Sequence, residues 1–221
     1  MNETQLIHVP TTIKGKLLIR TPNIASNNSC VLALHGYGES AAIMMQRLEP
    51  WLDSGFSLAC AQALHPIYLP NQKVGHSWMT SDHREEAITQ NLVYLENVIQ
   101  QLKEEVSFSN LIVLGYSQGA QMAMRVTRWL SGDHLIAVCG ELPPELREKP
   151  LYGNERQPIS ALLARGKKDI ALTQMTMSEN QSVLETWGVS CAEFELPGAH
   201  RWLDDWTDLL TPWLSEASSA P

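Results

Sequence analysis

Short apolar runs alternate with longer amphipathic stretches along the chain. The apolar runs have the length of β-strands, and several lack alternating polar positions, as strands covered on both faces do. They lie at residues 16–20, 31–34, 57–61, 111–116, 135–139, 161–164 and 192–196. This alternation predicts an α/β fold with a mostly parallel central sheet of about seven strands and helices on both faces.

The amphipathic stretches predict helices, because their apolar positions recur every three or four residues. Asp82, with Glu85 three residues later, has the pattern of a capping box at the start of the clearest helix. Pro50 is expected to divide the last turn of another helix, and Gly188 is expected to end a third. The predicted helices cover residues 40–53, 82–102, 173–187 and 202–213.

The length of 221 residues is typical of a single domain. We therefore expect one domain over residues 1–221, with a disordered tail rich in serine and alanine at residues 215–221. Residues 141–158 contain four prolines and predict a long ordered loop, not a linker between domains.

Charge and cysteine content narrow the class of protein. The net charge of −8 and the pI near 5.3 argue against nucleic acid or an anionic membrane as the main partner. No signal peptide is visible in the sequence, and no apolar run approaches the roughly 18 residues that span a bilayer. The four cysteines form no Cys-x-x-Cys pair, so they indicate neither a zinc site nor redox chemistry. We expect a cytoplasmic protein with reduced thiols.

A Gly-Tyr-Ser-Gln-Gly motif at residues 115–119 carries the strongest chemical signal. It follows a predicted strand and precedes a helix-forming stretch that ends near Gly132. Gly-x-Ser-x-Gly at a strand-to-helix turn is the pattern of a nucleophile elbow, whose strained backbone lifts the serine hydroxyl above the sheet edge. Ser117 is therefore a candidate nucleophile, although a glycine-rich connection with an ordinary hydroxyl would have the same pattern.

The strand at residues 31–34 leads into a loop with two glycines at residues 35–38. Such a loop can point a backbone N–H at the charge that develops on an attacked carbonyl. We expect the Tyr37 N–H to do so, with the Gln118 N–H in the first turn of the following helix as its partner. A simple β-turn is the alternative. His35 is expected to brace this loop, since it precedes the serine in the chain.

The chain contains seven histidines, of which only His134 and His200 follow Ser117. Enzymes with a nucleophile elbow present serine, acid and histidine in that order along the chain. His134 directly precedes a predicted strand and should lie at the sheet edge opposite the serine. His200 follows the strand at residues 192–196 and is therefore the candidate base, with a solvated turn histidine as the alternative.

The candidate acid lies between the serine and the histidine. Asp169 comes shortly after the predicted strand at residues 161–164, where it could hydrogen-bond to the imidazole and fix its tautomer. A charged surface turn, in which Asp169 pairs with Lys167 or Lys168, is the alternative. Glu141 is a rival acid, because it also ends a strand after the serine.

These segments together resemble the α/β-hydrolase superfamily, specifically the small phospholipase/carboxylesterase family that includes acyl-protein thioesterases. The similar segments are Leu-His-Gly-Tyr-Gly at 34–38, Gly-Tyr-Ser-Gln-Gly-Ala at 115–120, Gly-Lys-Lys-Asp at 166–169 and Gly-Ala-His at 198–200. The resemblance implies an α/β-hydrolase fold without a large lid, and hydrolysis of esters or thioesters of monocarboxylic acids without a cofactor. A homodimer would be in keeping with this family.

The sequence departs from the family pattern near the expected substrate pocket. Glu39 stands where members often carry Asp, and residues 170–172 lack the proline often found after the acid. Residues 78–80 are Trp-Met-Thr where the family often has Trp, an aromatic residue and Asp. By their positions in the family, Trp78 and Leu142 would line the acyl pocket, although both could equally be core residues.

We therefore expect a serine carboxylesterase that hydrolyses small to medium acyl esters through an acyl-enzyme on Ser117. An acyl thioesterase or lysophospholipase is the alternative within the same chemistry, since only the pocket separates these substrates. A non-catalytic small-molecule binding protein on the same fold is the alternative from another class. The expected partner is a small ester or thioester, with no nucleic acid and no stable membrane association.

Overall fold

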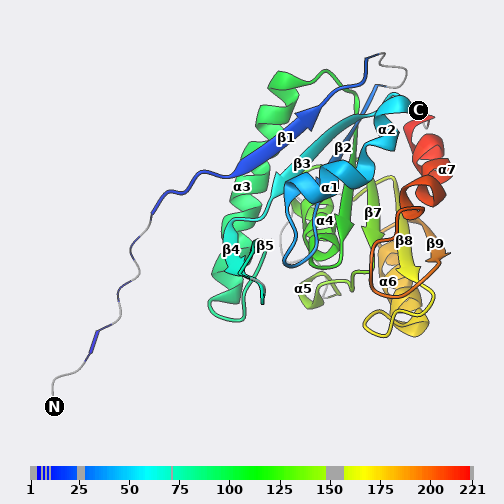
Figure 1. The fold of residues 1–221 in the computed structure, drawn as a ribbon. Helices are drawn as coiled ribbons and strands as arrows, with labels where there is room; N and C mark the ends of the chain where they lie inside the picture. The colour runs from blue at the N-terminus through cyan, green and yellow to red at the C-terminus, as the bar shows by residue number, and fades with distance from the viewer. Residues whose placement is uncertain are drawn as a thin grey trace.

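A seven-stranded sheet forms the middle layer of the computed structural model (Figure 1). The structure describes residues 11–23, 28–70, 72–147 and 157–219, together with residues 4, 5, 7 and 9. In spatial order its strands are β1 (Lys16–Arg20), β3 (Ser57–Gln62), β2 (Ser29–Leu34), β6 (Asn110–Tyr116), β7 (His134–Val138), β8 (Ser160–Gly166) and β9 (Ser190–Leu196). The edge strand β1 pairs antiparallel with β3, and all other pairs are parallel. The predicted mostly parallel sheet is confirmed, with each predicted strand in place.

Helices cover both faces of this sheet. One face carries α1 (Ala41–Leu48), α2 (Pro50–Asp53) and α7 (Trp206–Ser219), and the other carries α3 (Arg84–Glu105), α4 (Gln118–Trp129) and α6 (Gln174–Thr186). Alternate residues of one strand supply the two cores: in β6, Val113 packs with the α3 and α4 side, and Ile112 packs with the α1 and α7 side. Burial on both faces explains why the central strands show few polar positions.

Two predicted helix starts differ from the structure. The helix expected from Asp82 begins at Arg84, after His83 in a left-handed conformation, and no side chain caps it. The helix expected from residue 202 begins at Trp206, because the Trp202 ring packs against Tyr116 and Trp206 in the preceding loop. Pro50 indeed divides the helix expected over residues 40–53, since it is the first residue of α2.

The tail expected to be disordered from residue 215 is instead helical as far as Ser219. Ala217 in this stretch is buried, and its carbonyl accepts a hydrogen bond from the Asn110 side chain. The prediction was wrong because small residues such as alanine and serine also suit a helix that packs on a sheet. Residues 220–221 lie outside the described residues.

A two-stranded hairpin, β4 (His65–Tyr68) and β5 (Val74–Ser77), was not predicted. His76 at its end bonds to the loop after β2: its carbonyl accepts the Gly38 N–H at 2.9 Å, and its N–H donates to the Glu39 carbonyl at 3.1 Å. The hairpin therefore supports the loop that contains Tyr37. The loop expected over residues 141–158 begins with a short helix, α5 (Pro144–Arg147), while residues 148–156 lie outside the described residues.

The described helices include none that is both long enough and apolar enough to cross a bilayer.

Candidate active site

Ser117 lies at the sharp turn between β6 and α4. Its backbone has φ 54° and ψ −118°, a combination that non-glycine residues rarely adopt. The Ser117 N–H donates to the Val138 carbonyl at 2.8 Å, which holds the turn against the end of β7. A Cβ on Gly119 would lie 2.2 Å from the Leu34 carbonyl oxygen, so only glycine lets α4 approach β2 this closely. These features are those of a nucleophile elbow.

Three side chains from different strand ends form a hydrogen-bonded chain. The Ser117 Oγ lies 2.8 Å from Nε2 of His200, in the loop after β9. Nδ1 of the same imidazole lies 2.7 Å from Oδ2 of Asp169, which follows β8. The carboxyl ends of parallel strands meet at one sheet edge, and this brings together residues that are far apart in the sequence.

The Asp169 side chain is completely buried, and its second oxygen is also occupied. Oδ1 accepts the backbone N–H groups of Ala171 at 2.8 Å and Leu172 at 3.1 Å. Burial by itself raises the pKa of Asp169, but the hydrogen bonds from Leu172, His200 and Ala171 outweigh it and hold that pKa below its usual value. An ionised carboxylate fixes the proton of His200 on Nδ1, which leaves Nε2 as an acceptor for the serine proton.

The competing residues have other partners. The exposed carboxylate of Glu141 accepts a hydrogen bond from Arg147 at 3.1 Å. His134 contacts Ser160 at the opposite ends of the strands, with 2.8 Å between Nδ1 and Oγ. His35 is fully buried: its Nδ1–H donates to the Gly36 carbonyl at 2.7 Å and its Nε2 accepts the Ala63 N–H at 3.1 Å, so it braces the loop as expected.

The Tyr37 and Gln118 amides lie in adjoining segments, since α4 begins against the carbonyls of residues 34 and 35. Within the turns and loops that the structure describes, neither N–H donates to a backbone carbonyl. The Gln118 side chain has a separate role: Oε1 accepts the Trp78 N–H at 2.8 Å, and Nε2 donates to the Met79 carbonyl at 2.9 Å. It thereby fixes the segment that follows the hairpin.

Glu39 fixes the turn around Tyr37. Its carboxylate accepts the Gly36 N–H at 3.0 Å and two hydrogen bonds from Arg47 of α1, at 2.8 and 2.7 Å. The longer carboxylate side chain noted as a departure from the family pattern therefore has a defined structural role. The sequence could not reveal Arg47 as its partner, because helix position alone does not specify which loop a side chain reaches.

Cys139, at the end of β7, is a further residue that the sequence analysis did not select for the site. It has φ 54° and is buried, and its sulfur lies within 4.8 Å of the ligand atoms of Asp169 and His200. Burial raises the pKa of Cys139 to about 12, so the thiol is a donor at neutral pH. Its position at the last residue of the predicted strand 135–139 was the signal that could have identified it.

A cavity of about 360 Å³ opens beside the Ser117 hydroxyl. The residues that line it are Met79, Arg84, Ser117, Gln118, Gln121, Cys139, Gly140, Glu141, Ala171, Leu172 and His200. Trp78 and Leu142, expected to line an acyl pocket, are not among them. Both lie in the hydrophobic core with at most 1% of their surface exposed, and the Trp78 indole N–H donates to the His35 carbonyl at 2.8 Å. That expectation is corrected, because both residues are held in the core: the Trp78 carbonyl accepts a hydrogen bond from Asn91 of α3, and the Leu142 N–H donates to Asn180 of α6.

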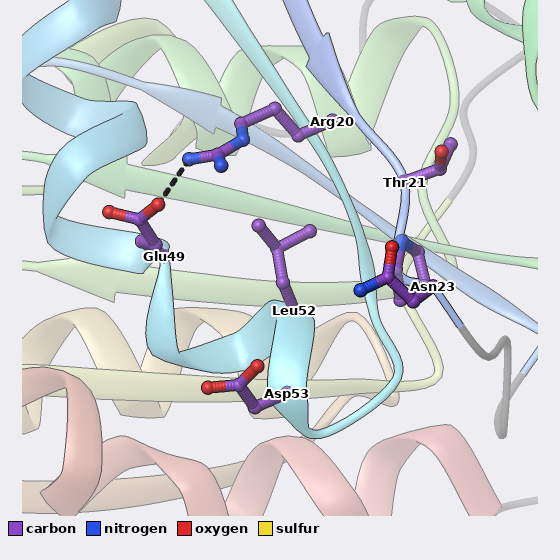
Figure 2. Close-up of a pocket in the computed structure, with 7 residues that line it drawn as sticks. Arg20, Thr21, Asn23, Glu49, Leu52 and Asp53 are labelled. Atoms are coloured by element: carbon purple, nitrogen blue, oxygen red, sulfur yellow. Dashed lines mark hydrogen bonds and ion pairs between the residues drawn. The ribbon is translucent and has the colours of Figure 1, made fainter.

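A second hollow, of about 540 Å³, lies between the end of β1 and α2. Figure 2 shows the ion pair between Arg20 and Glu49 above Leu52 at this place. The lining residues are Arg20, Thr21, Pro22, Asn23, Glu49, Leu52 and Asp53. They include carboxylates but no serine, histidine or cysteine. A serine paired with a histidine is found at the smaller cavity beside Ser117, which is therefore the candidate active site.

Cys139, Asp169 and His200 are the one group within the described chain whose ligand atoms cluster as for a metal, within 4.8 Å of one another. Asp169 and His200 are already joined by a hydrogen bond, and the raised pKa of the Cys139 thiol disfavours the thiolate that a metal would require. We therefore attribute the cluster to the serine, histidine and aspartate arrangement.

A serine elbow, a histidine and a buried aspartate at the carboxyl edge of this sheet define a serine hydrolase with the α/β-hydrolase fold. The sequence agrees with this class. The chain belongs to the serine hydrolase (FSH1) family, whose similarity extends over residues 25–201. No curated protein matches the sequence.

Solved structures show the same fold. Esterase PE8 superposes with a TM-score of 0.74 and 21% identity, over 93% of this chain and 100% of that one. A Bacillus cereus carboxylesterase superposes with a TM-score of 0.71 and 16% identity, over 92% of this chain and 94% of that one. Acyl-protein thioesterase 2 of Zea mays superposes with a TM-score of 0.69 and 18% identity, over 93% of this chain and 100% of that one. At these identities the likeness shows the fold alone.

Proposed function

We propose that the protein is a serine carboxylesterase in which Ser117 is the nucleophile, His200 the general base and Asp169 the residue that orients the imidazole. The observation that carries this proposal is the 2.8 Å separation between the Ser117 Oγ and Nε2 of His200, together with the 2.7 Å bond from Nδ1 to Asp169. These distances are within the range needed for proton transfer from a serine hydroxyl.

The reaction takes two steps. His200 removes the Ser117 proton as Oγ attacks the ester carbonyl, and the oxygen that becomes negative accepts the Tyr37 and Gln118 N–H groups. The imidazolium returns its proton to the leaving alcohol as the carbon–oxygen bond breaks, which leaves an acyl-enzyme. Water then attacks the acyl-enzyme with His200 again as the base, which releases the carboxylic acid and regenerates the free serine.

The size of the cavity supports small to medium acyl esters as substrates. A volume of about 360 Å³ is at the lower end of the range for small-molecule sites. Thioesters and lysophospholipids are rival substrates, because their carbonyls would use the same three side chains. A comparison of kcat/KM for esters and thioesters of one acid decides between these classes.

The test of the proposal is the Ser117→Ala variant with p-nitrophenyl butyrate. We expect turnover to fall by about 10⁶ at saturating substrate, while circular dichroism and the melting temperature remain near wild type. Ser182→Ala, which alters an exposed serine on α6, is the matched control and should keep full activity. A fluorophosphonate should label wild type and not Ser117→Ala. Labelling of both proteins would contradict the proposal. Labelling of neither protein would also contradict it and would favour the binding-protein alternative.

We also propose a cytoplasmic location. All four cysteines are free thiols, and Cys30, Cys60 and Cys139 are buried, as is usual in a reducing compartment. Cell fractionation tests this, and recovery of the native protein outside the cytoplasm would contradict it.

A further inference from the structure

Arg84 brings a positive charge to the wall of the cavity beside Ser117. It is the first residue of α3, its side chain is exposed, and it lines the same cavity as the Ser117 hydroxyl. An exposed guanidinium keeps its five N–H donors available to a ligand in that cavity.

Arg84 differs in its partners from five other arginines of this protein. Five arginines each form an ion pair with a glutamate: Arg20 with Glu49, Arg47 with Glu39, Arg125 with Glu145, Arg147 with Glu141, and Arg165 with Glu195. Arg84 makes no such pair with any carboxylate in the described ranges 11–23, 28–70, 72–147 and 157–219. Its charge is therefore not balanced by a bound carboxylate of those ranges.

The other charges of the cavity do not neutralise it. Among the residues that line this cavity, the one carboxylate is that of Glu141, which is exposed and already accepts a hydrogen bond from Arg147 at 3.1 Å. Asp169 lies behind the cavity and is fully buried against His200. Helices α3 and α4 both begin at the cavity, at Arg84 and Gln118, so the positive ends of two helix dipoles add to the guanidinium charge.

A local positive site is notable on a chain with a net charge of −8. The overall charge repels anions at long range, so selection of an anion requires a group within the cavity itself. A guanidinium suits a carboxylate better than an ammonium does, because it can donate two parallel hydrogen bonds to the two oxygens.

We propose that the preferred substrates are esters that carry a free carboxylate, and that Arg84 is the residue that selects them. This inference rests on the proposed serine esterase function and names the substrate class of the same site. The carboxylate could belong to the acid part, as in a monoester of a dicarboxylic acid, or to the alcohol part. The chemistry that Arg84 recognises is the same in both cases.

The experiment uses pairs of esters that differ only in methylation of the carboxylate. On the acid side, p-nitrophenyl hydrogen adipate is compared with p-nitrophenyl methyl adipate. On the alcohol side, 4-carboxyphenyl butyrate is compared with its methyl ester. The ratio of kcat/KM for the charged member to that for the methylated member is measured for wild type, Arg84→Gln and Arg84→Lys.

We expect this ratio to fall about tenfold in Arg84→Gln for one of the two pairs, because a hydrogen bond to a charged group is lost. The pair that responds identifies the side of the ester that bears the carboxylate. Arg84→Lys should retain part of the ratio, and the methylated esters should react as in wild type. Arg20→Gln makes the same charge change at the distant hollow of Figure 2 and should leave both ratios unchanged.

Changes of less than about twofold in both ratios would overturn the inference, as would an equal loss for charged and methylated esters. In either case, hydrolysis of the methylated esters that depends on Ser117 would leave the proposed esterase function intact. If no ester of either kind is hydrolysed in a manner dependent on Ser117, the proposed function fails and this inference fails with it.

Discussion

Arg47 on α1 holds Glu39 by two hydrogen bonds, and its guanidinium also lies over the rings of Tyr116 and Trp202, 5.4 and 5.6 Å from their centroids. The Tyr116 ring packs against the imidazole of His200 with 5.9 Å between centroids. One side chain therefore connects the loop that carries the Tyr37 amide with the loop that carries the proposed base. Both loops must keep their positions for the oxyanion and the proton to be stabilised together.

The first prediction concerns this connection. Arg47→Met should lower kcat for p-nitrophenyl butyrate by about tenfold, because the turn around Tyr37 loses its support. Complete loss of one oxyanion donor lowers kcat by about 10²–10³, and this sets the upper limit of the effect. KM should change less than kcat, since the amide acts on the transition state. Arg47→Lys, which keeps the charge but not the paired hydrogen bonds, should be intermediate. A variant Arg47→Met with unaltered kcat and only a lower melting temperature would show that the ion pair is purely structural.

The second prediction separates the two candidate acids. Asp169→Asn should lower kcat by about 10⁴, because the amide no longer fixes the proton on Nδ1 of His200. Glu141→Gln should retain kcat within about threefold, since its carboxylate contacts Arg147 and not the imidazole. Steady-state kinetics of both folded variants with one neutral ester provide the measurement. The reverse pattern would make Glu141 the orienting acid.

The third prediction concerns stability at low pH. Burial lowers the pKa of His35 from 6.5 to about 4, although the hydrogen bond to the Gly36 carbonyl partly opposes this effect. Between these two values the unfolded state binds the proton and the folded state does not, so the free energy of unfolding falls as pH drops from 6.5 towards 4. Well above pH 6.5 neither state is protonated at this residue, and its contribution is fully retained.

At pH 5 the expected loss from His35 is roughly 2 kcal/mol relative to pH 7. Urea unfolding of wild type and His35→Asn at the two pH values isolates this contribution, because the pKa values of His65, His76 and His134 are also lowered by burial and act equally in both proteins. Where the variant is too unstable to measure, titration of the His35 imidazole resonances of folded wild type by NMR gives its pKa directly. Equal losses in wild type and variant would refute the assignment to His35.

The fourth prediction concerns the thiols. Burial raises the pKa values of Cys30, Cys139 and Cys191 to about 12, and raises that of Cys60 further. At pH 8 only about 10⁻⁴ of such thiols are ionised, so iodoacetamide should leave the native protein unmodified and its activity unchanged. In guanidinium chloride all four cysteines should be alkylated, which intact-mass analysis can count. Rapid modification of Cys139 in the native protein would contradict its burial beside Asp169.

Much of the layered arrangement could be predicted from the sequence, because burial of a parallel sheet on both faces leaves apolar runs without alternation. The meeting of Ser117, Asp169 and His200 follows from the same property. All three come after β-strands that run in one direction, so their side chains emerge at one edge. Chain order left His134 and His200 as candidates. His200 was then preferred because it follows a strand, whereas His134 precedes one, and the structure places His134 at the other ends of the strands.

Features that depend on contacts between distant segments were not predictable. The hairpin of β4 and β5 has short strands, and its bonds to Gly38 and Glu39 are formed only once the fold brings these segments together. Trp202 suited the apolar stripe of a helix, yet its ring packs on Tyr116 ahead of α7. Trp78 and Leu142 were placed at the pocket by position in a family, whereas contacts with α3 and α6 that form only in the folded chain hold them in the core.

The lining of the cavity and the support behind it come from different places in the fold. Arg84, Ala171 and Leu172 lie at a helix start and in a turn, whereas Glu39 and Arg47 join the first helix to the turn after β2. Substitutions among the lining residues can change which substrates bind without breaking the hydrogen bonds between Glu39 and Arg47. Such a division favours divergence: duplicated copies of this gene could acquire new preferences by few changes while the reactive serine stays equally competent.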